Sequence, residues 1–127
     1  MSFVPRIVYE PAEDVRKLAL DIIRKLKFNH INPNRIFFVR SRNSRSSSVA
    51  RIWALPSIWR HTLSLEPMYV IEVLAEKYDI LPESEKIKIL IHELLHIPSK
   101  FSGGLRPHGK CVNRKRVNEL YLRFLTS

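Results

Sequence analysis

The segment Pro82–Pro98, P-E-S-E-K-I-K-I-L-I-H-E-L-L-H-I-P, predicts one buried helix. Acidic residues suit its first turn, where the helix dipole is positive. Apolar side chains then follow at helical spacing: Ile87, Leu90, Ile91, Leu94 and Leu95. Pro98 should end the helix, because its ring clashes with the preceding turn and it has no N–H to donate. We therefore expect His92 and His96 on the last two turns.

His92-Glu93-Leu94-Leu95-His96 is an H-E-x-x-H pentad. On a helix, this spacing places the two imidazoles on one face, one turn apart, where both can bind one metal ion while Glu93 reaches beside it. The alternative is that His92 and His96 are core histidines satisfied by hydrogen bonds. Each imidazole and the carboxylate would then need its own buried partner, whereas a metal ion satisfies both histidines together. The pentad therefore favours a metal site.

A third ligand is needed, since catalytic zinc usually takes three protein ligands and leaves the fourth position for water. His108 is the preferred candidate, because the turn at Phe101–Gly104 can fold the chain back over the helix and Pro107 stiffens the approach. Glu119 is a rival on a later segment that reads as helical. Cys111 is a further rival, because a thiolate also binds zinc. On spacing alone these alternatives stay open.

The stretch His92 to Gly109 resembles the small metallopeptidases of archaea, bacteria and phages, and its H-E-x-x-H followed by H-G is similar to the SprT and Wss1 type of minimal zincin. The resemblance implies a zinc-dependent metallopeptidase with one Zn²⁺ per chain. It implies that Glu93 is the general base and that the metal ligands are His92, His96 and His108. It also implies a small sheet packed on the metal helix, with an edge strand that holds the peptide substrate by main-chain hydrogen bonds.

Peptide hydrolysis follows from these parts. Zinc would polarise the scissile carbonyl and lower the pKa of its bound water, while Glu93 takes a proton from that water and later delivers it to the leaving amine. Arg106 and Tyr121 are candidates for stabilising the oxyanion or binding substrate. The favoured interpretation is that Arg106 is solvated and that Tyr121 packs within a C-terminal helix.

The order of elements predicts an α+β, minimal zincin-like fold: a helix, a three-stranded sheet, the H-E-x-x-H helix and a C-terminal helix. The helix at Ala12–Phe28 carries one apolar face, formed by Val15, Leu18, Ala19, Ile22, Ile23 and Leu26. The expected strands are Arg35–Arg40, Val49–Leu55 and Met68–Leu74, with a helical turn over Val73–Tyr78 as an alternative. The last helix is expected from about Lys110 to Phe124.

Length and composition fit a single domain over residues 1–127, because 127 residues with 45% hydrophobic content can bury one core. The lone Cys111 excludes an intrachain disulfide and agrees with a reducing compartment. Met1–Glu10 shows no signal-peptide pattern, and no apolar run approaches the ~18 residues of a membrane span. We therefore expect a cytoplasmic protein with no membrane partner. Glutamine is absent while Ile, Lys and Arg are plentiful, which favours a hot environment.

The net charge of +10 predicts attraction to nucleic acid or to another acidic partner. The Ser-rich stretch Ser41–Ser48 is expected to form a mobile, solvated hairpin loop. Alternatively, it is a phosphate-contacting finger that uses Arg40, Arg42 and Arg45. A second basic cluster comprises Lys110, Arg114, Lys115 and Arg116. Trp53 and Trp59 could stack on bases, although packing in the core is the favoured interpretation.

Two hypotheses from different classes follow. The first is a zinc-dependent metallopeptidase that acts on a protein or peptide, either free or bound to nucleic acid. The second is a basic nucleic-acid-binding protein, of a virus or mobile element, with a structural or catalytically inactive metal site. Glu93 favours the enzyme, because a purely structural zinc site needs no carboxylate there and would close its fourth position with another ligand.

Overall fold

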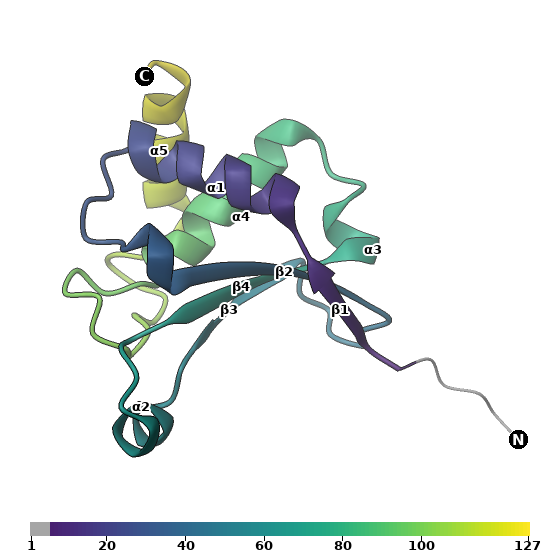
Figure 1. Ribbon diagram of the computed structural model, residues 1–127. Helices are drawn as coiled ribbons and strands as arrows, with labels where there is room; N and C mark the ends of the chain where they lie inside the picture. Colours follow the sequence, from purple (N-terminus) through teal and green to yellow (C-terminus); the bar gives the residue numbers. More distant parts are fainter. Residues whose placement is uncertain (1–5) are drawn as a thin grey trace, which may run out of the picture.

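The computed structural model describes residues 6–127, in which a four-stranded sheet carries helices on one face (Figure 1). The elements are β1 (Val8–Pro11), α1 (Glu13–Lys25), a 3₁₀ turn (Pro33–Arg35), β2 (Ile36–Arg42), β3 (Ala50–Ala54), α2 (Ser57–Leu63), β4 (Tyr69–Leu74), α3 (Ala75–Tyr78), α4 (Glu83–Leu95) and α5 (Arg114–Leu125). Helices α1, α4 and α5 form the layer above the sheet, and α2 projects below one end of it (Figure 1). The predicted α+β, zincin-like class is confirmed.

The sheet has the strand order β1-β2-β4-β3. β2 and β4 are parallel, whereas β1 and β3 run antiparallel to their neighbours and form the two edges. The hairpin predicted between the strands at Arg35–Arg40 and Val49–Leu55 is therefore wrong, because β4 lies between β2 and β3. β4 pairs with a strand on each side, and its side chains are buried at every position except Val70, as expected for the centre of a covered sheet.

Two elements have no counterpart in the sequence prediction, which gave three strands rather than four. β1 has only four residues, ends in Pro11 and stays mostly exposed, so it shows no alternation of apolar and polar side chains. α2 buries no residue at all, so it lacks the apolar stripe by which helices are recognised. The two alternatives for Val73–Tyr78 both hold in part, because β4 ends at Leu74 and α3 follows at once.

The core lies between the sheet and the helical layer. It is built from one apolar face each of α1 and α4 and from the inward side chains of β2 and β4, which include Ile22, Phe38, Tyr69, Ile71 and Leu90. The tryptophans do not belong to it: Trp53 is 52% exposed and Trp59 is 56% exposed. The core-packing interpretation of both is therefore wrong. Within residues 6–127, no helix has the length and apolar content to cross a bilayer.

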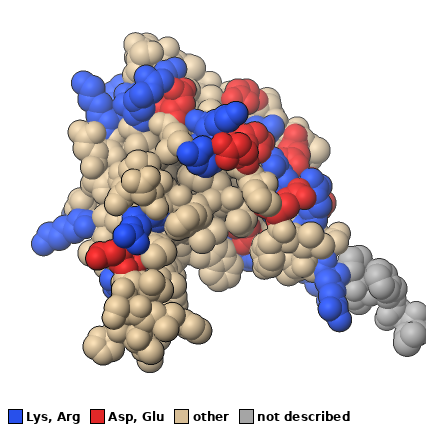
Figure 2. Space-filling view, viewed as in Figure 1, with Lys and Arg blue, Asp and Glu red and all other residues tan. Residues whose placement is uncertain are grey.

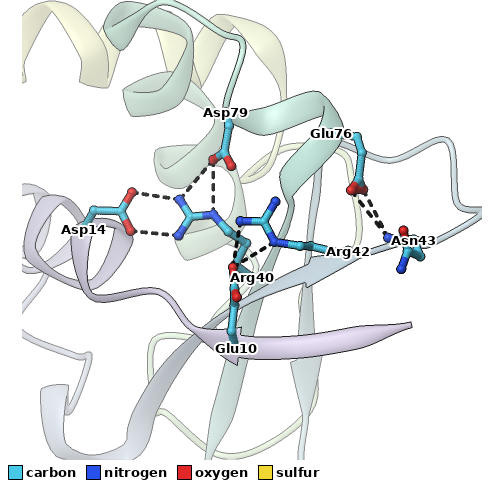
Figure 3. A network of polar contacts seen from close by, with 7 residues as sticks. All are labelled: Glu10, Asp14, Arg40, Arg42, Asn43, Glu76 and Asp79. Carbon is cyan, nitrogen blue, oxygen red and sulfur yellow. Dashed lines mark hydrogen bonds and ion pairs between the residues drawn. The ribbon is translucent and has the colours of Figure 1, made fainter. Parts of the chain in front are cut away.

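Two of the three arginines expected to contact phosphate are instead ion-paired (Figure 3). β2 runs as far as Arg42, so Arg42 lies in the strand with Arg40 rather than in the following loop. Arg40 is 13% exposed and binds Asp14 at 2.8 Å and Asp79 at 3.0 Å. Arg42 binds Glu10 at 2.8 Å. These contacts tie β2 to β1, to the first turn of α1 and to the residue after α3.

The loop between β2 and β3 is held by one hydrogen bond from α3 and by hydrogen bonds within the loop. Lys77 donates to the carbonyl oxygen of Ser46 at 2.6 Å, and the backbone N–H of Ser48 donates to the Ser46 hydroxyl at 3.1 Å. Arg45 is the arginine of the predicted finger that does lie in this loop, and its side chain is exposed. A finger with three free arginines is thus not what the chain forms.

Candidate metal centre

α4 carries the first two histidines at its C-terminal end. The helix ends at Leu95, before Pro98, so His96 directly follows the last turn rather than lying on it. The backbone N–H of His96 donates to Glu93 O at 3.1 Å and that of Ile97 to Leu94 O at 3.1 Å, so the chain tightens into 3₁₀ geometry before Pro98. His92 and His96 nevertheless remain one turn apart, as predicted.

The loop after Pro98 returns to α4 because it is pinned to the sheet. The backbone N–H of Gly103 donates to the Tyr69 hydroxyl at 2.8 Å. Gly103 has a φ of +106°, and a Cβ at this position would lie 2.8 Å from the Arg60 guanidinium. The positive φ therefore favours glycine there, whereas the flexible end of the Arg60 side chain could shift to admit a Cβ. The predicted fold-back of the chain over the helix is what the structure shows.

Three histidine side chains meet at this point. His92 Nε2 lies 3.1 Å from His108 Nε2 and 3.3 Å from His96 Nε2. Nitrogens bound to one tetrahedral zinc at about 2.0–2.1 Å are roughly 3.3 Å apart, so the two observed distances suit a shared ion. Within residues 6–127, His92, His96 and His108 are the group that can hold a metal in this way. Three imidazoles are the donor set of many catalytic zinc sites.

Arg106 holds the third histidine against the helix end. Its carbonyl oxygen lies 2.5 Å from His96 Nδ1, and its backbone N–H donates to His96 O at 2.7 Å. Its guanidinium donates twice to Leu95 O, at 2.8 and 3.0 Å. Arg106 is partly buried. Its guanidinium donates to the carbonyl oxygen of Leu95, and its backbone N–H donates to that of His96, at the C-terminal end of α4. It is therefore neither solvated nor directed at a substrate, and the predicted oxyanion role does not fit these contacts.

Glu93 is buried beside the histidines, with 8% of its surface exposed. Burial raises the pKa of its carboxyl to about 7, because the charged form loses hydration. Burial also lowers the pKa of His92 to about 4, with smaller contributions from the charges of His96 and His108. His92 is thus neutral near pH 7, the form in which an imidazole binds a metal.

An open groove of about 910 Å³ gives access to the cluster. One wall is the edge strand β3 with the two residues before it, and the other is formed by α4 and the first turns of α5. The groove is lined by His92, Glu93, His96 and His108, so all four lie on one accessible surface. This identifies β3 as the edge strand beside the cluster, which the sequence left open.

The rival ligands lie elsewhere. Glu119 is exposed on α5 and lies 3.7 Å from Arg116, and Cys111 is exposed, so neither joins the histidine cluster. Tyr121 packs against the core, as expected, beneath the ammonium group of Lys88.

Of the basic cluster, Arg114 lines the groove, whereas Lys110, Lys115 and Arg116 are exposed outside its lining. Sequence reasoning missed Lys88, which also lines the groove. In the sequence, Lys88 stands four residues before His92, and this spacing could have placed it on the same helix face as the histidines.

The basic residues do not form one stripe on the face shown in Figure 2. Lys and Arg side chains alternate there with Asp and Glu over the helical layer, and the tip of the projection formed by α2 is uncharged. On this face the charge is therefore mixed rather than uniformly positive, and a nucleic-acid partner stays a prediction.

The family model described as "Putative phage metallopeptidase" matches residues 7–124 of the 127-residue chain. No curated protein and no solved structure matches the chain. The similarity to SprT- and Wss1-type proteases therefore stays a prediction.

Proposed function

The chain belongs to the putative phage metallopeptidase family, and from this premise we propose that it is a zinc-dependent peptidase that hydrolyses peptide bonds in proteins or peptides. His92, His96 and His108 are the proposed zinc ligands, and Glu93 is the proposed general base. One observation carries the proposal: three imidazole nitrogens converge beside a buried carboxylate on the wall of an open groove.

The donor set supports zinc as the metal. Three neutral imidazoles suit first-row ions and leave one tetrahedral position for water or substrate. When bound, a zinc ion would supply a Lewis acid that polarises the scissile carbonyl and lowers the pKa of a water molecule.

The chain's own residues supply the proton transfers and the orientation. Glu93 lies next to His92 in the chain and lines the same groove, so it can accept a proton from water and return it to the leaving nitrogen. His96 is held by Arg106, so its Nε2 keeps the lone pair toward the other histidines. The outer edge of β3 borders the groove, and its free backbone groups can pair with an extended peptide.

Replacing Glu93 by glutamine tests the proposal. Zinc-loaded wild type and Glu93→Gln protein would be assayed on fluorescently labelled casein, with zinc content measured on the same samples. We expect at least about a hundredfold loss of rate with zinc retained, since general bases contribute that much or more. Glu83→Gln, an exposed change in the first turn of α4, is the matched control and should cleave like wild type. Equal rates for Glu93→Gln and wild type would remove Glu93 from the mechanism.

The second hypothesis is a nucleic-acid-binding protein whose metal site is structural or inactive. Its support is the net charge of +10 and the exposed basic residues at the start of α5. Titration of a fluorescent single-stranded oligonucleotide at rising salt tests it. An affinity that stayed flat between low and moderate salt would contradict phosphate contacts.

A further inference from the structure

The groove at the histidine cluster is lined by three basic side chains, Arg51, Lys88 and Arg114. Arg51 is already neutralised, because its Nε lies 2.8 Å from the buried carboxylate of Glu72. Lys88 and Arg114 are the other two positive charges of the lining, whose acidic side chains are Glu85 and Glu93.

Lys88 is placed close to the cleavage point by the geometry of α4. It lies four residues before His92 on the same helix face, which is about 6 Å along the helix axis. Its ammonium group lies 4.9 Å from the centre of the Tyr121 ring. Its distance to the Glu85 carboxylate is 3.9 Å, which is long for an ion pair. The ring positions the side chain without neutralising it, so Lys88 keeps its positive charge at the groove wall.

Arg114 is the first residue of α5 and is exposed. Among the contacts of residues 6–127, its guanidinium takes part in no ion pair or side-chain hydrogen bond. The first turn of α5 holds basic residues and no acidic one, although the positive end of the helix dipole disfavours cations there. Arg114 therefore places an unpaired positive charge at this end of the groove.

We propose that the groove selects peptides with Asp or Glu side chains near the scissile bond, and that Lys88 and Arg114 determine this specificity. The inference rests on the proposed peptidase function. An extended peptide rises about 3.3 Å per residue. For a peptide that runs along α4 with its scissile bond at His92, the 6 Å offset of Lys88 corresponds to a side chain about two residues from that bond.

Binding measured apart from cleavage tests this specificity. The zinc-loaded Glu93→Gln protein would be titrated into two fluorescein-labelled ten-residue peptides that are identical except for Asp or Asn two residues on either side of the centre. Asn has the shape of Asp without its charge. We expect the Asp peptide to bind about two- to fivefold more tightly per charge at low salt, with the difference shrinking as salt rises.

Charge reversal assigns the effect to the groove. Adding Arg114→Glu should abolish the preference for Asp and favour a Lys-containing peptide. Lys115→Glu is the matched control, since it makes the same change of charge in the same helical turn but outside the groove lining. It should keep most of the preference. Equal affinities for the two peptides, or equal effects of the two reversals, would overturn the proposal.

The outcomes separate this inference from the peptidase function. Zinc- and Glu93-dependent cleavage of casein without any preference for Asp would overturn the inference and leave the function standing. A preference for Asp without any cleavage would overturn the peptidase function and leave the binding preference of the groove standing. A single-stranded oligonucleotide would serve as competitor. If it displaced the Asp peptide and lost affinity with Arg114→Glu but not with Lys115→Glu, the two cations would be assigned to nucleic-acid binding and the inference would be overturned.

Discussion

The carbonyl oxygen of Arg106 lies 2.5 Å from Nδ1 of His96, and the backbone N–H of Arg106 donates to the His96 carbonyl oxygen at 2.7 Å. This pair of contacts fixes the His96 ring with Nδ1 as donor and Nε2 free to bind a metal. It also sets the position of His108, which follows only two residues later. One residue of the loop thus orients His96 and positions His108, two of the three proposed metal ligands.

Arg106→Ala should weaken zinc binding without unfolding the protein. The change keeps the backbone contacts but removes the two guanidinium hydrogen bonds to Leu95 O, so the segment that carries His108 loosens. We expect about a tenfold loss of zinc affinity, measured by competition with a chelator, as is usual for groups that orient metal ligands. Lys100→Ala, an exposed change in the same loop, is the control. Equal zinc affinities for the two variants would show that the guanidinium does not position the site.

Glu72→Gln should destabilise the fold and change its response to acid. Burial of Glu72 raises the pKa of its carboxyl, but hydrogen bonds, first that of Arg51 and also that of the Trp53 indole, outweigh burial and hold the pKa below its ordinary value of 4.5. The ionised form therefore stabilises the protein above about pH 4.5, and this stabilisation is lost as the pH falls through the lowered pKa.

Urea denaturation at several pH values measures this effect. At pH 7 we expect Glu72→Gln to cost about 1–3 kcal/mol, since Arg51 and Trp53 lose an ionised partner in a buried place. The variant should also lose less stability than wild type on acidification below pH 4.5. The exposed change Glu83→Gln should do neither. Parallel pH curves for wild type and Glu72→Gln would contradict the assignment.

Arg40→Met should lower stability more than Arg42→Met, although both arginines lie on β2 and both bind carboxylates (Figure 3). Arg40 is 13% exposed and joins Asp14 and Asp79, whereas Arg42 is 48% exposed and binds Glu10 alone. We expect about 1–2 kcal/mol for Arg40→Met and under about 1 kcal/mol for Arg42→Met, because exposed ion pairs contribute little. Equal free energies of unfolding for the two variants would contradict a structural role specific to Arg40.

The helices that build the core were predictable from the sequence because their apolar side chains recur at helical spacing. α1 and α4 both show this pattern, and the pentad lies at the end of α4. β1 and α2 were not predictable, since short exposed elements carry no periodic signal. The pairing of β3 with β4 rather than β2 also escaped prediction, because strand order depends on contacts between segments distant in the chain.

The candidate site divides in the same way. His92, Glu93 and His96 follow from local spacing, and His108 was preferred from the turn chemistry before it. The role of Arg106 could not be predicted, because every contact that it makes at the helix end involves a backbone atom, and backbone acceptors leave no mark in the sequence. The alternative of a phosphate finger with three free arginines does not hold, because Arg40 and Arg42 are paired with Asp14, Asp79 and Glu10, which lie far away in the chain.

Zinc stoichiometry and affinity in wild type, His108→Ala and Glu119→Ala test the three-histidine site most directly. Each protein would be stripped of metal, supplied with zinc near neutral pH and examined by native mass spectrometry and chelator competition. We expect about one zinc per chain in wild type and Glu119→Ala, and loss of most of the affinity in His108→Ala. Zinc binding by His108→Ala as tight as that of wild type, or its loss in Glu119→Ala instead, would contradict the site.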